Sequence, residues 1–93
     1  MTQGDPTSAG PTVTIRVRAF ARYAELLGAD VIDVEVTAPT RVNDVVAALR
    51  AQAPDGHLIP EHPMVSVNLE HIHADQAVGE TDEIAILPPL AGG

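Results

Sequence analysis

The last twelve residues, DEIAILPPLAGG (Asp82–Gly93), decide how the fold of this 93-residue chain is interpreted. A short apolar run with two isoleucines predicts a closing β-strand over Glu83–Leu87. Successive side chains of a strand point to opposite faces, so Ile84 and Ile86 share one face and Ala85 and Leu87 share the other. Proline cannot donate a hydrogen bond to a sheet, so strand pairing is expected to stop at Pro88.

Residues 88–93 are predicted to form an extended tail. The adjacent Pro88 and Pro89 favour polyproline geometry, which projects the chain away from the domain. The four residues that follow, Leu90-Ala-Gly-Gly, span at most about 13–14 Å. Because Gly92 and Gly93 have no side chains, the tip could enter a narrow channel. A terminal carboxylate is an anion at neutral pH, with an ordinary pKa of about 3.3–3.7, and it can attack an activated phosphate to become an acyl-adenylate.

The first ordered segment is predicted to be a strand followed by a helix. Val13–Arg18 alternates apolar and polar residues, as a half-buried strand does. Apolar residues then recur at helical spacing, at Phe20, Tyr23, Ala24 and Leu27. Gly28 can end this helix in the left-handed conformation that glycine adopts easily.

A second strand and helix are predicted next. The strand covers Ile32–Val36 and ends before Pro39. Thr40 can cap the second helix, which stops by Pro54. Its apolar face has the spacing i, i+3, i+4 and i+7, at Val42, Val45, Val46 and Leu49.

The remaining segments are predicted to be short strands joined by loops. The Pro-rich stretch 54–63 is expected to be a loop with one short turn. Strands follow over Met64–Asn68 and His71–His73, and Asp75–Asp82 is expected to be a loop. Four or five strands with two main helices over residues 12–87 predict one small α+β domain, with the helices on one face of the sheet. Residues 1–11 are rich in Gly, Pro, Ser and Thr and are predicted to form a disordered tail.

The charge of the chain argues against nucleic acid as a partner. Five arginines face thirteen acidic residues, lysine is absent, and the net charge is −8. Phosphate neutralisation supplies most non-specific nucleic-acid affinity, so an acidic surface is repelled. The acidity either keeps the protein soluble or speeds its encounter with a basic protein partner.

Several site classes are excluded or set aside. The chain has no cysteine, which excludes disulfides, thiolate metal sites and a thiol nucleophile. Residues 1–11 lack the pattern of a signal peptide, and no apolar run is long enough to span a membrane, so a cytoplasmic location is expected. His71, His73 and Asp75 alternate and would share one face of a strand, but no third strong ligand is fixed in sequence, so no metal site is expected.

The motifs AELLG after the first strand, VNLEHI after the third, and DEIAILPPLAGG at the end resemble those of ubiquitin-like sulfur-carrier proteins. Within that family the chain is most similar to the small subunits of molybdopterin synthase, over about residues 13–93. The resemblance implies a β-grasp fold, in which a mixed, curled sheet wraps around a helix.

The resemblance also implies a function. An E1-like enzyme would use Mg-ATP to adenylate Gly93, and a sulfur donor protein would convert the chain end into a thiocarboxylate. The tail would then insert into the large subunit of a heterotetramer of two carriers and two large subunits. There it would donate sulfur to cyclic pyranopterin monophosphate. The carrier would bind no cofactor of its own and would be a non-catalytic, sulfur-donating subunit.

Residue roles follow from the same resemblance. Gly93 would carry the acyl group and Gly92 would pass the narrow channel, while the tail would be positioned by Pro88, Pro89, Leu90 and Ala91. Leu87 and Phe20 would dock the partner, although Phe20 could equally lie in the core. Three alternatives stay open: a sulfur carrier for cysteine, thiamine or tRNA thiolation, a ubiquitin-like modifier of other proteins, and an interaction module with an inert tail.

Overall fold

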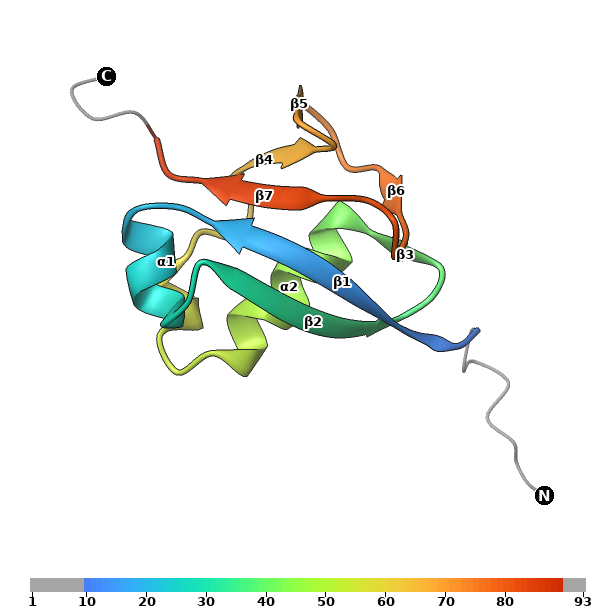
Figure 1. Ribbon diagram of the computed structural model, residues 1–93, viewed down its shortest axis with the longest axis horizontal. Helices are drawn as coiled ribbons and strands as arrows, with labels where there is room; N and C mark the ends of the chain where they lie inside the picture. The colour runs from blue at the N-terminus through green and yellow to red at the C-terminus, as the bar shows by residue number, and fades with distance from the viewer. Residues whose placement is uncertain (1–9, 90–93) are drawn as a thin grey trace.

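Five strands form one mixed sheet in the computed structural model, which describes residues 10–89 (Figure 1). In sequence order they are β1 (Thr12–Ala19), β2 (Val31–Thr37), β4 (Met64–Val67), β5 (Glu70–Ile72) and β7 (Ile84–Leu87). Their order across the sheet is β2-β1-β7-β4-β5. The central pair, β1 and β7, is parallel, and the other pairs are antiparallel.

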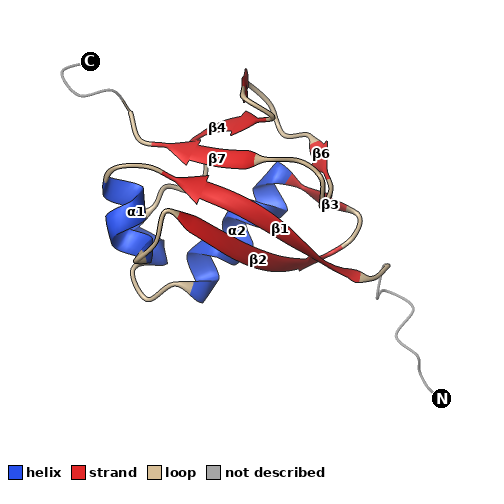
Figure 2. Cartoon of the chain, viewed as in Figure 1, coloured by secondary structure: helices blue, strands red, loops and turns tan. Residues whose placement is uncertain are grey.

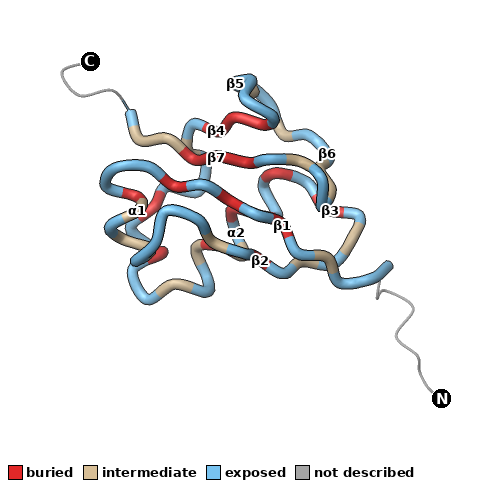
Figure 3. Tube along the Cα trace, viewed as in Figure 1, coloured by how far each residue is buried: buried red, intermediate tan, exposed pale blue. Residues whose placement is uncertain are grey.

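Helix α2 (Val42–Gln52) covers one face of this sheet (Figure 2). Its buried residues are the four predicted from helical spacing, Val42, Val45, Val46 and Leu49. They pack against inward-facing strand residues, among which Ile15, Val34, Ile84 and Ile86 are fully buried. Burial therefore alternates along β1 (Figure 3). A mixed sheet that curls around one helix is the predicted β-grasp, of the α+β class.

The smaller elements surround this core. Helix α1 (Arg22–Leu27) ends at Gly28, whose φ of 78° and hydrogen bond to the Ala24 carbonyl form the predicted left-handed cap. The short helix η1 (Gly56–Leu58) is the single turn expected in the Pro-rich loop. It packs against α1 and α2. Within the described residues, no helix has the length and apolar character needed to cross a membrane.

Phe20 does not belong to the apolar face of the first helix, as its spacing suggested. The helix begins at Arg22, and Tyr23 is the residue that it buries. Ala21, between Phe20 and the helix, has a φ of 53°, which turns the chain sharply after β1. Phe20 is therefore 42% exposed instead of packed in the core.

The prediction that Thr40 caps the second helix is wrong. Thr40 lies in a two-residue strand, β3 (Thr40–Arg41), which pairs with β6 (Ala77–Val78) inside the stretch predicted to be a loop. The hydroxyl of Thr40 is buried without a hydrogen-bond partner. Arg41 is the N-cap residue, and its backbone N–H donates to the Asp44 carboxylate at 3.0 Å.

Asp75 completes the cap of helix α2 from a distant loop. Its carboxylate accepts the backbone N–H of Asn43, in the first turn, at 2.9 Å, which is the bond that a local N-cap side chain usually provides. The same carboxylate accepts the Arg41 Nε–H at 3.0 Å. The Gln76 carbonyl accepts the N–H of Val42, also at 2.9 Å. The hydrogen bond from Asn43 is the main cause that lowers the pKa of Asp75 below its ordinary value, and Arg41 adds to it.

Replacing Asp75 by alanine is expected to lower the melting temperature by about 5 °C at pH 7, since the helix loses its cap. A carboxyl whose pKa is lowered by folding stabilises the protein above its unfolded pKa of about 3.9 and loses this effect as the pH falls through the folded value. The difference between wild type and Asp75→Ala should therefore shrink in acid below about pH 3.9. Thermal unfolding followed by circular dichroism between pH 7 and 2.5 tests this. A difference that stays constant over that range would contradict the assigned role of the carboxylate.

Candidate functional site

The face of the sheet opposite α2 is open, and side chains from four strands meet on it. Pairing places Arg18 beside Ala85, Ala85 beside Ser66, and Ser66 beside His71. These residues form one row across β1, β7, β4 and β5. The next row toward the end of β7 contains Met64 opposite Leu87.

A hollow of about 270 Å³ lies over these rows. Its floor is formed by the small residues Ser66 and Ala85, each 8% exposed. The rim is formed by Arg18, Phe20, Leu69, His71, Glu83 and Leu87. We call this feature the docking hollow, defined by these eight residues.

Phe20 and Leu87, the two predicted docking residues, both line the docking hollow. They come together because β1 and β7 run parallel and end side by side, with Ala19 paired to Ile86 (Figure 1). The following residues, Phe20 and Leu87, then share the open face. Their partner-docking role stays a prediction.

The chain leaves the sheet directly at this hollow. β7 ends at Leu87, and the half-buried Pro88 and exposed Pro89 follow outside the strand. Pairing stops at the prolines, as expected from their missing N–H groups. The predicted tail residues Leu90, Ala91, Gly92 and Gly93 lie outside the described residues.

Two arginines on the open face are paired with carboxylates. Arg18 lies 3.4 Å from Glu83, and Arg16 lies 3.5 Å from Asp33, with all four side chains half or more exposed. Exposed pairs of this kind contribute little to stability. The Arg18–Glu83 pair reduces the charge at the rim, so the hollow offers mainly small and apolar surface.

The turn between β4 and β5 is hydrogen-bonded to the two residues that precede β7. Asn68 donates from Nδ2 to the Asp82 carboxylate at 2.9 Å and accepts the Glu83 N–H on Oδ1 at 2.9 Å. The Asp82 carboxylate also accepts the Gly79 N–H at 2.7 Å. The hydrogen bond from Asn68, followed by that from Gly79, lowers the pKa of Asp82 below its ordinary value. Asp82 is thus a structural residue that fixes one end of the docking hollow.

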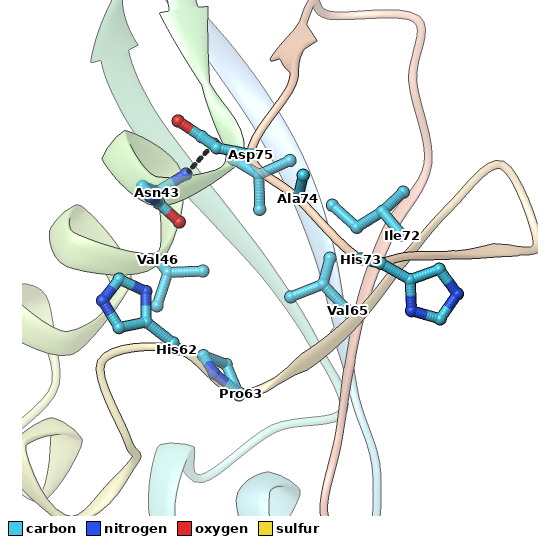
Figure 4. A pocket seen from close by; sticks show the side chains of 10 residues that line it. Asn43, Val46, His62, Pro63, Val65, Ile72, His73, Ala74 and Asp75 are labelled. Atoms are coloured by element: carbon cyan, nitrogen blue, oxygen red, sulfur yellow. Dashed lines mark hydrogen bonds between the residues drawn. The ribbon is translucent and has the colours of Figure 1, made fainter.

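The alternating histidines do not form a common site. His71 lines the docking hollow, whereas His73 lies beyond the end of β5 and lines a separate recess. That recess, of about 310 Å³, opens between α2 and β4–β5, with Val46, Val65 and Ile72 among its lining residues (Figure 4). His62 and His73 point to different sides of it, and Asp75 faces Asn43 (Figure 4). Among the described residues no group of three or more potential metal ligands comes together.

Sequence reasoning assigned a docking role to two of the eight residues that form the docking hollow, Phe20 and Leu87, and missed the other six. Ser66 and His71 could have been placed there by period-two alternation, once the pairing of β4 with β5 was known. The closing strand was known to present Ala85 outward with Leu87, but the small floor it shares with Ser66 depends on the register. Leu69 gave no signal, because hairpin turns are recognised by glycine or Asn-Gly and this turn is Asn68-Leu69.

Comparisons with known proteins show the family of the chain. The family model described as "ThiS family" matches residues 17–93. The molybdopterin synthase sulfur carrier subunit of Dictyostelium discoideum is 33% identical over 82 residues, which cover 84% of this chain and 94% of that protein.

Two solved structures have the same fold. The small archaeal modifier protein 1 of Haloferax volcanii has a TM-score of 0.74 and 26% identity, covering 84% of this chain and 99% of that chain. A protein of Pyrococcus furiosus described as a putative molybdopterin converting factor, subunit 1, has a TM-score of 0.72, with the same 84% and 99% coverage. At 21% identity this second likeness concerns the fold alone. With a family match over residues 17–93 and a relative one-third identical, the chain belongs to the ThiS family and has its ubiquitin-like β-grasp fold.

Proposed function

We propose that this protein is a sulfur carrier that serves as the small subunit of molybdopterin synthase. The observation that carries the proposal is its similarity to the D. discoideum sulfur carrier subunit over 84% of the chain. The structure adds support, because the predicted tail begins at Pro88, beside a hollow that contains both predicted docking residues. The carrier itself is non-catalytic, and its chemistry takes place inside its partners.

Activation of the chain end requires an E1-like adenylating enzyme and Mg-ATP. A carboxylate oxygen of Gly93 attacks the α-phosphorus of ATP, forming a new P–O bond. The bond between the α- and β-phosphates breaks, and pyrophosphate leaves. A sulfur donor protein then supplies sulfur at the oxidation level of sulfide. This sulfur bonds to the acyl carbon, AMP leaves, and Gly93 ends in a thiocarboxylate.

Sulfur transfer takes place in the large subunit. The extended tail reaches the active site, and the thiocarboxylate sulfur bonds to a carbon of cyclic pyranopterin monophosphate. The C–O bond at that carbon breaks, and its oxygen substituent leaves. Water then cleaves the acyl–sulfur bond and restores the Gly93 carboxylate. Two carriers and two large subunits form the heterotetramer that builds the dithiolene. The carrier holds no cofactor in this scheme.

Loading of the chain end tests the proposal. The purified protein is incubated with the adenylating enzyme, Mg-ATP and a sulfur donor, and its intact mass is measured. We expect the mass increase caused by replacing one oxygen atom with sulfur, located at Gly93 by fragmentation. A mass that stays unchanged while the enzyme loads a known carrier would contradict the proposal.

The substitution Phe20→Asp is expected to weaken binding of the large subunit at least tenfold without altering the fold. Aromatic residues at the centre of an interface often contribute most of the binding energy. Phe20 is 42% exposed, so the free protein tolerates a carboxylate there. Calorimetric titration measures the affinity, with Leu58→Asp as control, since Leu58 is 51% exposed on η1 outside the hollow. Equal affinities of wild type and Phe20→Asp would refute the docking role.

A protein modifier is the second candidate function, favoured by the similarity to a protein named small archaeal modifier protein 1. In that case the activated Gly93 forms an isopeptide bond with a lysine of another protein. Cells that express a tagged copy would contain conjugates of higher mass, which disappear when Gly93 is removed. The chain contains no lysine, so a conjugated copy offers no side-chain amine for a second one.

A further inference from the structure

We propose that Leu69, at the tip of the β4–β5 turn, is a binding anchor for the adenylating enzyme. The inference rests on the proposed function. Leu69 is 85% exposed, more than any other exposed large hydrophobic residue among those described. It lies on the rim of the docking hollow.

The turn requires Leu69 to adopt a backbone conformation that disfavours leucine. Its φ is 72°, in the left-handed region where a residue with a β-carbon is disfavoured. A two-residue turn with positive φ at both positions favours glycine at the second one. Leucine there is unfavourable for the backbone and also leaves an apolar side chain in water. Strain of this kind concentrates at functional sites.

The other non-glycine residues with positive φ in the described chain each lie next to a residue that lines the docking hollow. Positive φ occurs at three non-glycine residues within 10–89, namely Ala21, Asn68 and Leu69. Ala21 directly follows Phe20, and Asn68 precedes Leu69. The two strained turns therefore present the two large side chains at opposite ends of the hollow, Phe20 beside the tail root and Leu69 beside His71.

The turn that carries Leu69 is held in place before any partner arrives. Asn68 makes two side-chain hydrogen bonds, to Asp82 and from the Glu83 N–H, and its own N–H donates to the Glu83 carbonyl at 2.7 Å. A side chain presented by a fixed turn loses little freedom on binding, and this preorganisation increases affinity.

The position of the tail supports the adenylating enzyme as the partner. Pro89 emerges beside the hollow, and the four residues after it extend at most about 14 Å. An enzyme that brings the Gly93 carboxylate to ATP must therefore lie against the surface around the tail root. Adenylation precedes both sulfur loading and protein modification, so this enzyme is common to both candidate functions. Leu69 would fit an apolar pocket on that enzyme, surrounded by a surface whose positive charge complements the net charge of −8.

The test compares Leu69→Asn with wild type in ATP–pyrophosphate exchange catalysed by the purified E1-like enzyme of the same organism. Asparagine tolerates the left-handed conformation but removes the apolar side chain. We expect the KM for the carrier to rise at least tenfold with kcat unchanged, while the melting temperature is equal or higher. Leu69→Gly relieves the strain fully. It should show the same raised KM as Leu69→Asn and a higher melting temperature than wild type.

Leu58→Asn is the matched control, since it removes an exposed leucine from η1 outside the hollow. Its KM should equal that of wild type. If both Leu69 variants keep the wild-type KM while wild type shows exchange that depends on Gly93, the anchor is refuted and the proposed function stands. If wild type shows no exchange with an enzyme that activates another carrier, the proposed function and the anchor both fail.

Discussion

Removing Gly93 is expected to reduce adenylation of this protein to below one hundredth of the wild-type rate. The shortened chain still ends in a carboxylate, but that group lies about 3.3–3.6 Å short of its position in the full-length tail. A displacement of about 1 Å can already cost a hundredfold in rate when reacting groups must be aligned. ATP–pyrophosphate exchange with the E1-like enzyme measures the loss.

The fold should be unaffected by this deletion. β7 ends at Leu87, and its buried residues Ile84 and Ile86 lie well before the tail. Circular dichroism and the melting temperature of the truncated protein should match those of wild type. A chain extended by one glycine is the matched control. It displaces the carboxylate by the same length in the other direction, so it should also be inactive in adenylation. Exchange at the wild-type rate by the truncated protein would exclude Gly93 as the activated residue.

Replacing Gly92 by valine is expected to slow sulfur transfer at least a hundredfold. Valine adds a branched side chain next to the reacting end, and such a side chain widens a tip that we propose must pass a narrow channel. Gly92→Ala should have an intermediate effect, because it adds a single methyl group. The rate is measured with chemically prepared thiocarboxylate proteins and the large subunit, so that loading does not limit the reaction.

The binding of Gly92→Val to the large subunit separates docking from transfer. Its affinity should fall less than its rate, since the docking hollow is unchanged. Transfer by the valine variant at the wild-type rate would show that the tip does not pass through a narrow channel.

Periodic patterns in the sequence predicted the central elements correctly. Helix α2 buries the four residues at helical spacing, since one face of a helix must pack on the sheet. β7 directs Ile84 and Ile86 into the core and stops at Pro88, because proline lacks the N–H that pairing needs. These features depend on residues close together in sequence, so each can be predicted from its own segment alone.

The errors concern features that depend on distant residues. The cap of α2 comes from Asp75, which is 32 residues away from Asn43, and β3 pairs with a strand in what was predicted to be a loop. Thr40 had the chemistry of a cap, but its pairing with Val78 placed it in a strand instead. Phe20 continued the helical spacing of Tyr23, yet the positive φ of Ala21 separates it from the helix.

The docking hollow was predictable in part. Leu87 and Phe20 were named as docking residues, and the parallel pairing of β1 with β7 brings them together. The floor of Ser66 and Ala85 depends on the register between β4 and β7, which no single strand specifies. Leu69 could not be found from composition, because the turn adopts left-handed geometry without glycine.

One reconstituted reaction tests the proposed function most directly. Chemically prepared thiocarboxylate protein is mixed with purified molybdopterin synthase large subunit and cyclic pyranopterin monophosphate. Molybdopterin is then followed through the fluorescence of its oxidised derivative. We predict that product forms with the full-length thiocarboxylate and fails to form with protein that lacks Gly93. A thiocarboxylate that persists without product, while a known carrier reacts with the same large subunit, would contradict the assignment to molybdopterin synthesis.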